Sequence, residues 1–250
     1  MPAIVFYDIT SDLPGIAWSL NTWKTRLTLN YKGLPYKTEW VEFHEIERRS
    51  KELGIKPTGK RPDGSDYYSL PAIHDPATGT YLADSLAIAK YLDATYPETP
   101  RIFPDGTDGL QEAFGHAWSS CLTSMYALIG PVILPHLSEA SQNYVRNAQE
   151  KLFGAKFEDI VPKGERAVQA WQTFKDSLER VDGWFAETDN RGPFIMGDKV
   201  SWGDILVGSS LIWIKVVCGE GSKEWQDVSA WHGGRWGKLV ASLDKYAARD

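Results

Sequence analysis

The first 43 residues follow a strand–helix–strand pattern, and this order restricts the fold of everything after it. Residues 3–7 and 36–43 are short runs rich in β-branched and aromatic side chains. Between them, apolar side chains recur at helical spacing over residues 20–31, and Gly-Leu-Pro at 33–35 ends the helix. Two strands joined through a helix require a crossover connection, so we expect them to pair in parallel.

The next segment predicts a short helix, a hairpin and another helix. Residues 44–53 are charged and indicate a short exposed helix, and residues 54–68 indicate a polar loop. Runs at 70–74 and 80–82 are separated by Asp-Pro-Ala-Thr-Gly, which is typical of an antiparallel hairpin with a longer turn. The helix that follows spans residues 84–97. This order, β-α-β, short helix and β-β-α, is that of the thioredoxin-like fold.

A change of composition marks the end of this unit. Residues 97–109 contain three prolines and two glycines, and the pattern beyond them is helical throughout. The expected fold class is therefore α/β followed by all-α. We assign a thioredoxin-like domain to residues 1–97, a linker to 98–109 and an all-helical domain to 110–250.

Three segments of the second domain carry clear helical signals. Residues 110–128 have apolar side chains along one face, and Pro131 and Pro135 kink or end that helix. Residues 167–185 form a regular amphipathic helix. The segment 201–217 opens with Ser-Trp-Gly-Asp, an N-capping pattern, and is then apolar nearly all round, which predicts the buried central helix of the domain.

Composition narrows the class of protein. A formal net charge of −6 argues against a nucleic-acid partner, which requires a clustered basic face. Cys121 and Cys218 lie in apolar helix-like runs and are interpreted as buried free thiols, which favours a reducing, cytoplasmic location. No signal peptide is visible, and the longest apolar run, residues 205–217, is too short to span a membrane. The five histidines show no metal-ligand spacing, so we assign no metal.

Ser19 lies where the first helix begins. A hydroxyl there is close to unpaired backbone N–H groups and to the positive end of the helix dipole, both of which favour negative charge. A thiol bound there would have its thiolate stabilised, because such donors pair most strongly with an anion. The simpler alternative is that Ser19 is only an N-cap, which contributes about 1 kcal/mol to helix stability.

Two further pairs of residues predict a site for a small zwitterionic peptide. Leu70-Pro71 opens a short strand, and a cis bond there leaves the backbone of Leu70 available to an extended ligand. Asp84-Ser85 starts a helix, whose N-terminus attracts an anion while Asp84 can pair with an ammonium group. A trans edge-strand proline and a plain N-cap are the alternatives. The fold order brings both pairs and Ser19 to one end of the sheet.

Three longer motifs carry a resemblance to a known family. They are Ser-x-Asn-Thr-Trp-Lys-Thr-Arg at 19–26, Lys-Gly-Leu-Pro-Tyr-Lys-Thr-Glu-Trp-Val-Glu at 32–42, and Leu-Ala-Asp-Ser-Leu-Ala-Ile-Ala-Lys-Tyr-Leu-Asp at 82–93. Together with the domain order, they resemble the glutathione transferases over essentially the whole chain. Within that superfamily they look like the fungal class A and etherase-like enzymes, which are relatives of bacterial β-etherases.

The resemblance implies that Ser19 is the catalytic serine that stabilises the thiolate of glutathione. The relatives usually have proline after this serine, whereas this chain has Leu20, so Asn21 is a second candidate for the thiolate donor. The resemblance also implies a set of residues that bind the rest of glutathione. They are Leu70 and the cis-proline Pro71 for the cysteinyl backbone, Asp84 and Ser85 for the γ-glutamyl group, and Lys56, Lys60 or Arg61 for the glycine carboxylate.

The wall that binds the second substrate is expected on the helical domain, facing Ser19. The expected members are aromatic and apolar side chains of one helix, for which a place in the core is the alternative: Trp118, Leu122, Met125 and Tyr126.

Three functions are consistent with these residues. The first is an enzyme without membrane attachment that uses glutathione as co-substrate to attack electrophilic aromatic, aryl-ether or peroxide substrates. The resemblance implies that such an enzyme is a homodimer. The second is a non-catalytic protein that sequesters hydrophobic or phenolic small molecules such as plant polyphenols, for which the eleven tryptophans are the motive. The third is a helix-rich structural protein without a thiol site.

Overall fold

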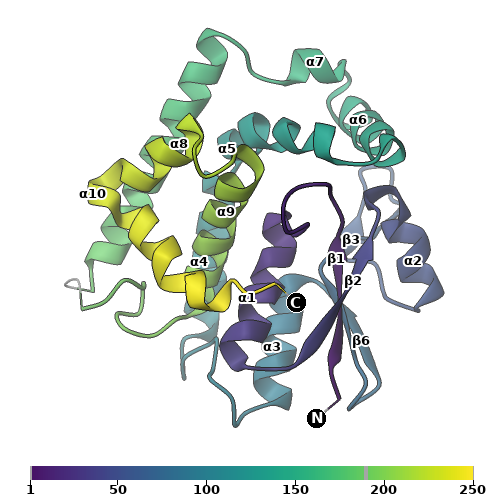
Figure 1. Ribbon diagram of the computed structural model, residues 1–250, viewed down its shortest axis with the longest axis vertical. Coiled ribbons are helices and arrows are strands. Elements are labelled where there is room, and N and C mark those ends of the chain that lie inside the picture. Colours follow the sequence, from purple (N-terminus) through teal and green to yellow (C-terminus); the bar gives the residue numbers. More distant parts are fainter. Residues whose placement is uncertain (1, 189–190, 250) are drawn as a thin grey trace.

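The N-terminal half is built on a mixed β-sheet (Figure 1). The structure, a computed structural model, describes residues 2–188 and 191–249, in which this sheet has four strands in the order β2-β1-β5-β6. β1 (Ile4–Ile9) pairs in parallel with β2 (Tyr36–Val41), as the crossover predicted. β5 (Ala72–Asp75) runs antiparallel to β1 and to β6 (Thr80–Ala83), which confirms the hairpin.

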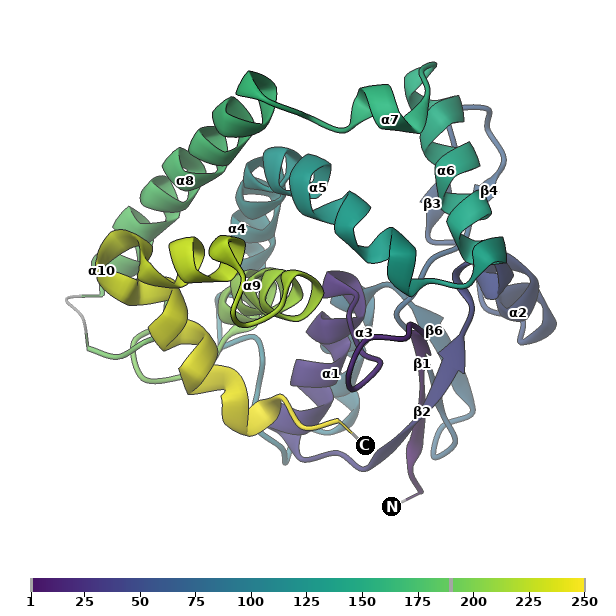
Figure 2. The same ribbon diagram turned by 45° about the horizontal axis from the view of Figure 1, so that its top comes forward.

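Helices pack on this sheet in the thioredoxin-like order. α1 (Leu20–Lys32) and α3 (Ser85–Thr95) lie side by side, whereas α2 (Ile46–Glu52), entered through the 3-10 turn η1 (Phe43–Glu45), lies on the opposite side of the strands (Figures 1 and 2). α1 ends where the sequence predicted, because Gly33 adopts a left-handed φ of 66°. The fold class expected for this half is confirmed.

The polar loop predicted over residues 54–68 contains a small hairpin. β3 (Gly59–Lys60) and β4 (Asp66–Tyr67) are antiparallel, with Lys60 opposite Asp66. Strands of two residues are too short to show an alternating pattern, so the sequence did not indicate them. The hairpin lies beside the helical half, where Lys151 Nζ is 2.8 Å from the Asp63 carboxylate (Figure 2).

The rest of the chain is helical, as expected. In chain order its elements are α4 (Asp108–Cys121), α5 (Thr123–Ile129), η2 (Gly130–His136), α6 (Glu139–Phe153), α7 (Phe157–Ile160), α8 (Glu165–Ala186), α9 (Trp202–Cys218), α10 (Lys223–Leu243) and η3 (Asp244–Tyr246).

The prediction of one helix over residues 110–128 was wrong. The segments Asp108–Cys121 and Thr123–His136 are bent by 51° relative to each other. At the break, the Leu122 N–H donates to the carbonyl oxygen of Ser119, three residues back, at 3.2 Å. This tighter 3-10 type of turn interrupts the α-helical pattern without any proline or glycine to announce it. α5 then ends at Ile129, just before Pro131, as the prolines indicated.

α9 is the buried centre of the helical half. Ser201 and Asp204 form the predicted capping box, in which the Ser201 side chain faces the backbone N–H of Asp204 and the Asp204 carboxylate accepts the backbone N–H of Ser201 at 2.8 Å. The Ser201 hydroxyl also donates to that carboxylate at 2.8 Å. α9 also packs directly against α1. Trp23 and Leu27 of α1 share one hydrophobic core with residues of α9, so the two halves are joined through α1.

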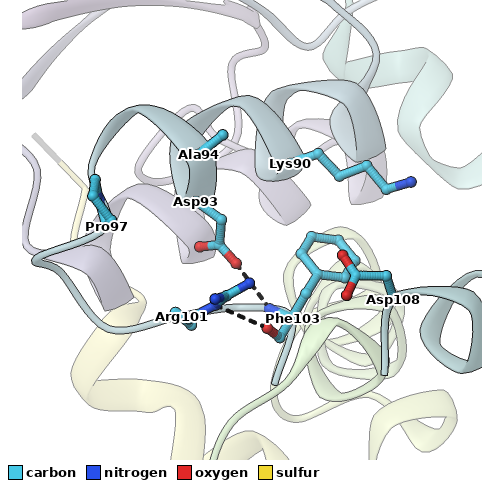
Figure 3. Close-up of a pocket in the computed structure, with 7 residues that line it drawn as sticks. All are labelled: Lys90, Asp93, Ala94, Pro97, Arg101, Phe103 and Asp108. Atoms are coloured by element: carbon cyan, nitrogen blue, oxygen red, sulfur yellow. Dashed lines mark hydrogen bonds between the residues drawn. The ribbon is translucent and has the colours of Figure 1, made fainter. Parts of the chain in front are cut away.

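Asp93 fastens the segment that connects the two halves (Figure 3). Its carboxylate accepts hydrogen bonds from Lys32 Nζ at 2.7 Å and from the backbone N–H groups of Ile102 and Phe103, each at 2.9 Å. A pocket of about 350 Å³ lies here between α3 and the connecting segment. Its cations are already paired, for example Arg101 with Asp105 at 2.7 Å. The exact limits assigned to the linker, 98–109, stay a prediction.

Within the described residues, no single helix has the length and apolar composition needed to cross a membrane. One strongly bent pair of segments, Asp108–Cys121 with Thr123–His136, meets these criteria on length and composition alone.

Candidate functional site

Ser19 stands immediately before α1 and is almost completely buried, with 6% of its surface exposed. Its backbone carbonyl accepts the Trp23 N–H at 2.9 Å and the Thr22 hydroxyl at 3.0 Å. Its own hydroxyl makes no hydrogen bond to any residue that the structure describes. The alternative, in which this side chain caps α1, is therefore not what the structure contains.

The loop that leads into Ser19 is held by contacts with the helical half. The Asp12 N–H donates to the His136 carbonyl at 3.0 Å, and the Asp12 carboxylate lies 2.7 Å from His136 Nδ1. Inside the loop, the Trp18 indole N–H donates to the carbonyl of Thr10 at 3.2 Å. These bonds fix the approach of the backbone to α1, and with it the position of Ser19.

The C-terminal segment braces the same loop from another side. Asn30 of α1 donates from Nδ2 to the carbonyl oxygens of Tyr246 and Ala248, at 2.8 and 3.0 Å. The guanidinium of Arg249 then donates to the carbonyl of Pro14 at 3.0 Å. The last described residues thus connect α1 with the loop that carries Ser19, and α1 passes close to the C-terminus in both views (Figures 1 and 2).

The second part of the candidate site lies at Pro71 and Asp84. The Leu70–Pro71 bond is cis, as expected. The Asp84 N–H donates to the Pro71 carbonyl at 3.2 Å, so the proline turn and the start of α3 are neighbours. Asp84 has a φ of 82°, which is rare for a residue with a side chain and is typical of functional sites.

The side chains of Asp84 and Ser85 are only partly used by the fold. One oxygen of Asp84, Oδ1, caps α3 by accepting the N–H groups of Leu86 and Ala87 at 3.0 and 2.9 Å. The structure gives the Oδ2 atom no hydrogen bond to a described residue, and the same is true of the Ser85 hydroxyl. This helix start can therefore offer both a negative and a positive partner to a zwitterion.

Lys24 connects the starts of α1 and α3, and the sequence reasoning missed it. Its Nζ donates to Asn21 Oδ1 at 2.9 Å. Burial lowers the pKa of Lys24 to about 8, and the charge of the nearby Asp84 carboxylate acts in the opposite direction. The available signal was the spacing, since residues three apart on a helix are neighbours on its surface.

The three cationic side chains considered as partners of a ligand carboxylate differ in whether they already form an ion pair within the protein. Lys60 is paired with Asp66 at 2.6 Å, and Arg61 with Glu47 at 2.9 Å. Lys56 is exposed and forms no ion pair with any residue in the described part of the chain.

The four residues expected to line the wall for a second substrate divide into two groups. Trp118, Leu122 and Met125 are buried in the core that spans both halves of the chain, so they present almost no surface to a ligand in this conformation. Tyr126 is 41% exposed, and its ring lies 5.5 Å from that of the buried Trp213. Burial of its phenol group raises the pKa of Tyr126 to about 12, with a further contribution from Tyr67 of the β3–β4 hairpin.

The two cysteines are free thiols, as predicted, but they differ in burial. Cys121 is buried as expected, whereas the expected burial of Cys218 was wrong, because this residue near the end of α9 is partly exposed. Among the described residues there is no group of three or more His, Cys, Asp or Glu side chains that could hold a metal ion.

The fold and the two helix starts define a class of protein, and comparison with known sequences gives the family. The chain matches the family model of the glutathione S-transferase N-terminal domain over residues 18–95 and that of the C-terminal domain over residues 109–246. The chain belongs to the glutathione S-transferase family.

Individual relatives support the same placement. A glutathione S-transferase-like protein of Aspergillus flavus, ustS, is 31% identical over 83% of this chain and 79% of its own length. The crystal structure of glutathione transferase GSTFuA3 from Phanerochaete chrysosporium has a TM-score of 0.94 at 38% identity, covering 100% of this chain and 99% of the other. A glutathione S-transferase of Ceriporiopsis subvermispora, solved in complex with glutathione, has a TM-score of 0.92 at 42% identity, covering 99% and 98%.

The free hydroxyl of Ser19 predicts an unusual result for stability. Because no hydrogen bond to the protein is lost, Ser19→Ala should change the free energy of unfolding by less than about 0.5 kcal/mol. Ser222→Ala is the matched control, since the Ser222 hydroxyl caps α10 by accepting the Trp225 N–H at 3.1 Å. That variant should lose about 1 kcal/mol. Denaturant unfolding of both variants measures the difference, and equal losses would show that Ser19 also acts as a cap.

Proposed function

We propose that the protein is a glutathione transferase that activates the thiol of glutathione at the start of α1. The observation that carries the proposal is the Ser19 hydroxyl, which is fixed at the N-terminus of a 13-residue helix and is not used by the fold. A hydroxyl in this position can donate to a sulfur anion, and the helix dipole favours the same charge. The solved relative from Ceriporiopsis subvermispora, which contains glutathione, supports the choice of this thiol.

The remainder of glutathione would extend from this point toward α3. The α-ammonium of its γ-glutamyl group would pair with Asp84 Oδ2, and the α-carboxylate would meet the Ser85 hydroxyl and the N-terminus of α3. The cysteinyl backbone would pair with the backbone of Leu70, beside the cis bond to Pro71. This orientation is supported by the Asp84–Pro71 hydrogen bond, because that bond keeps the two binding elements adjacent.

The chemical benefit is a larger fraction of thiolate at neutral pH. Lowering a thiol pKa from about 8.5 to about 7 raises the thiolate fraction roughly tenfold, and each pKa unit corresponds to about 1.4 kcal/mol. The thiolate sulfur would then form a bond to an electrophilic carbon while the leaving group departs with the bonding electrons. Electrophilic aromatics and aryl ethers are the proposed substrate classes for this attack on carbon, in line with the etherase-like motifs of the sequence. With a peroxide, the third proposed class, the thiolate would attack an oxygen atom and release the alcohol. The resulting sulfenic acid of glutathione would then react with a second glutathione to give the disulfide and water.

Ser19 and Asn21 are both candidates for the thiolate donor, and single substitutions separate them. A hydrogen bond to an anion contributes about 1.5–3 kcal/mol, so loss of the true donor should raise the pKa of bound glutathione by about one to two units. Ser19→Ala should show this shift, while the affinity for glutathione changes little. Ultraviolet titration of the bound thiolate and the pH dependence of kcat/KM measure it. A Ser19→Ala enzyme with an unchanged pH profile would remove Ser19 from this role.

Lys56 is the proposed partner of the glycine carboxylate, because it is the candidate cation without an ion pair in the described chain. Lys56→Ala should weaken glutathione binding about three- to fivefold, the size of a partly exposed ion pair. The glycine ethyl ester of glutathione has no carboxylate there, so its affinity should not respond to the substitution. Lys60→Ala is the comparison variant, and a larger loss for Lys60→Ala would move the assignment to that residue.

Tyr126 is the proposed contact for the second substrate or for a bound phenolic ligand. Tyr126 is partly exposed, at 41%, and its hydroxyl stays protonated at neutral pH, so the side chain can stack on an aromatic ring and donate a hydrogen bond. Tyr126→Ala should weaken the binding of a phenolic compound, followed by tryptophan fluorescence, about tenfold, whereas Tyr126→Phe should retain most of the stacking. Binding without any glutathione conjugation of several electrophiles would favour the ligand-storage function. Equal affinities in wild type and Tyr126→Ala would exclude this residue.

A further inference from the structure

The contact between Lys24 and Asn21 fixes the orientation of an amide. An ammonium group has donors and no acceptor, so it must meet the oxygen of the Asn21 side chain and not its nitrogen. The observed bond joins Lys24 Nζ to Asn21 Oδ1 at 2.9 Å. The Nδ2 group of Asn21, with its two N–H donors, therefore points away from the Lys24 ammonium group.

The position of Lys24 is set by more than this bond. Asn21 and Lys24 lie three residues apart in the first turns of α1, where the surfaces of such residues adjoin. The Lys24 side chain is partly buried, and the Asp84 carboxylate at the start of α3 attracts its charge. Lys24 thus contacts Asn21 next to the proposed sulfur end of the site, and its charge interacts with Asp84 at the proposed γ-glutamyl end.

We propose that Lys24 is a positioning residue that holds the Asn21 amide with its N–H donors toward the sulfur of bound glutathione. The inference rests on the proposed function, because it concerns the same thiolate. It adds a role for Asn21 that does not compete with Ser19: the hydroxyl and the oriented amide donate to the anion together. Without the ammonium, the amide can turn over and present its oxygen, which repels a thiolate.

The experiment is a double-mutant cycle between Lys24 and Asn21. Lys24→Met keeps most of the length of the side chain and removes the donors, Lys24→Arg keeps both charge and donors, and Asn21→Ala removes the amide. The thiolate absorbance of bound glutathione is measured at neutral pH, where Lys24 carries its proton, and the thiol pKa is obtained by titration. Calorimetry gives the affinity for glutathione in each variant, so that loss of binding is separated from loss of thiolate.

Lys24→Met should raise the thiol pKa by about one unit, a roughly tenfold loss of thiolate, and Lys24→Arg should restore most of it. In the Asn21→Ala background, Lys24→Met should change the thiolate fraction less than about twofold, because a residue that acts through another has no effect once its partner is gone. A Ser19→Ala background is the control, in which the Lys24→Met effect should persist.

Several results would overturn the inference. An effect of equal size with and without Asn21 would mean that Lys24 acts by its charge alone, and an Asn21→Ala protein with the wild-type thiol pKa would leave no amide to position. If wild-type protein and Lys24→Met lower the thiol pKa of bound glutathione equally, the role of Lys24 is contradicted while the proposed function stands. Wild-type protein that binds glutathione without lowering its thiol pKa would contradict the proposed function as well.

Discussion

A buried ion pair between Asp8 and Arg26 sets the position of α1 on the sheet. Both side chains are fully buried, and Arg26 Nη2 lies 2.9 Å from Asp8 Oδ2. The guanidinium also lies over the rings of Phe6 and Trp40, at 5.0 and 5.5 Å from their centres. Removing one partner of such a pair typically costs about 3–5 kcal/mol, because it leaves an uncompensated buried charge. Because Arg26 holds α1 at its middle, the N-terminal half of the helix, which contains Asn21 and Lys24 and follows Ser19, has a defined position. One stretch of eight residues therefore contains both the anchor and the groups that it positions.

The candidate site depends on two helix starts that meet because of the thioredoxin-like order. α1 follows a strand and presents Ser19, while α3 follows the antiparallel hairpin and presents Asp84. The Asp84–Pro71 hydrogen bond and the charge interaction between Lys24 and Asp84 connect them. Each helix start favours an anion, and in the proposed function Asp84 would supply the negative partner of the γ-glutamyl ammonium. Binding and activation of a small zwitterionic thiol would then both depend on a helix N-terminus.

Much of this arrangement could be predicted from the sequence, and the failures have physical causes. The crossover and the capping box at Ser201 depend on local patterns, whereas the cis bond before Pro71 was expected from the family resemblance; all three are confirmed. The break at Leu122 follows from a change to a 3-10 type of backbone hydrogen bond, which the residue types at this position do not predict. Periodicity also could not separate the exposed Tyr126 from the buried Trp118, because the spacing of apolar residues does not show which side chain the packing leaves at the surface. Lys24 was missed because an isolated lysine on a helix usually indicates a solvated surface.

The bracing of the Ser19 loop by the C-terminal segment matters for how the protein is handled. Arg249 bonds to Pro14 and Asn30 bonds to two carbonyls of the same segment, so any tension on that end of the chain reaches the loop directly. The start of β1 at Ile4 lies at the other end of the strand that leads into the loop. Attachment to a solid support or to a fusion partner therefore has different effects at the two ends of the chain. A tether beyond Arg249 transmits force to the loop that carries Ser19, whereas a tether before Ile4 does not act on this bracing contact.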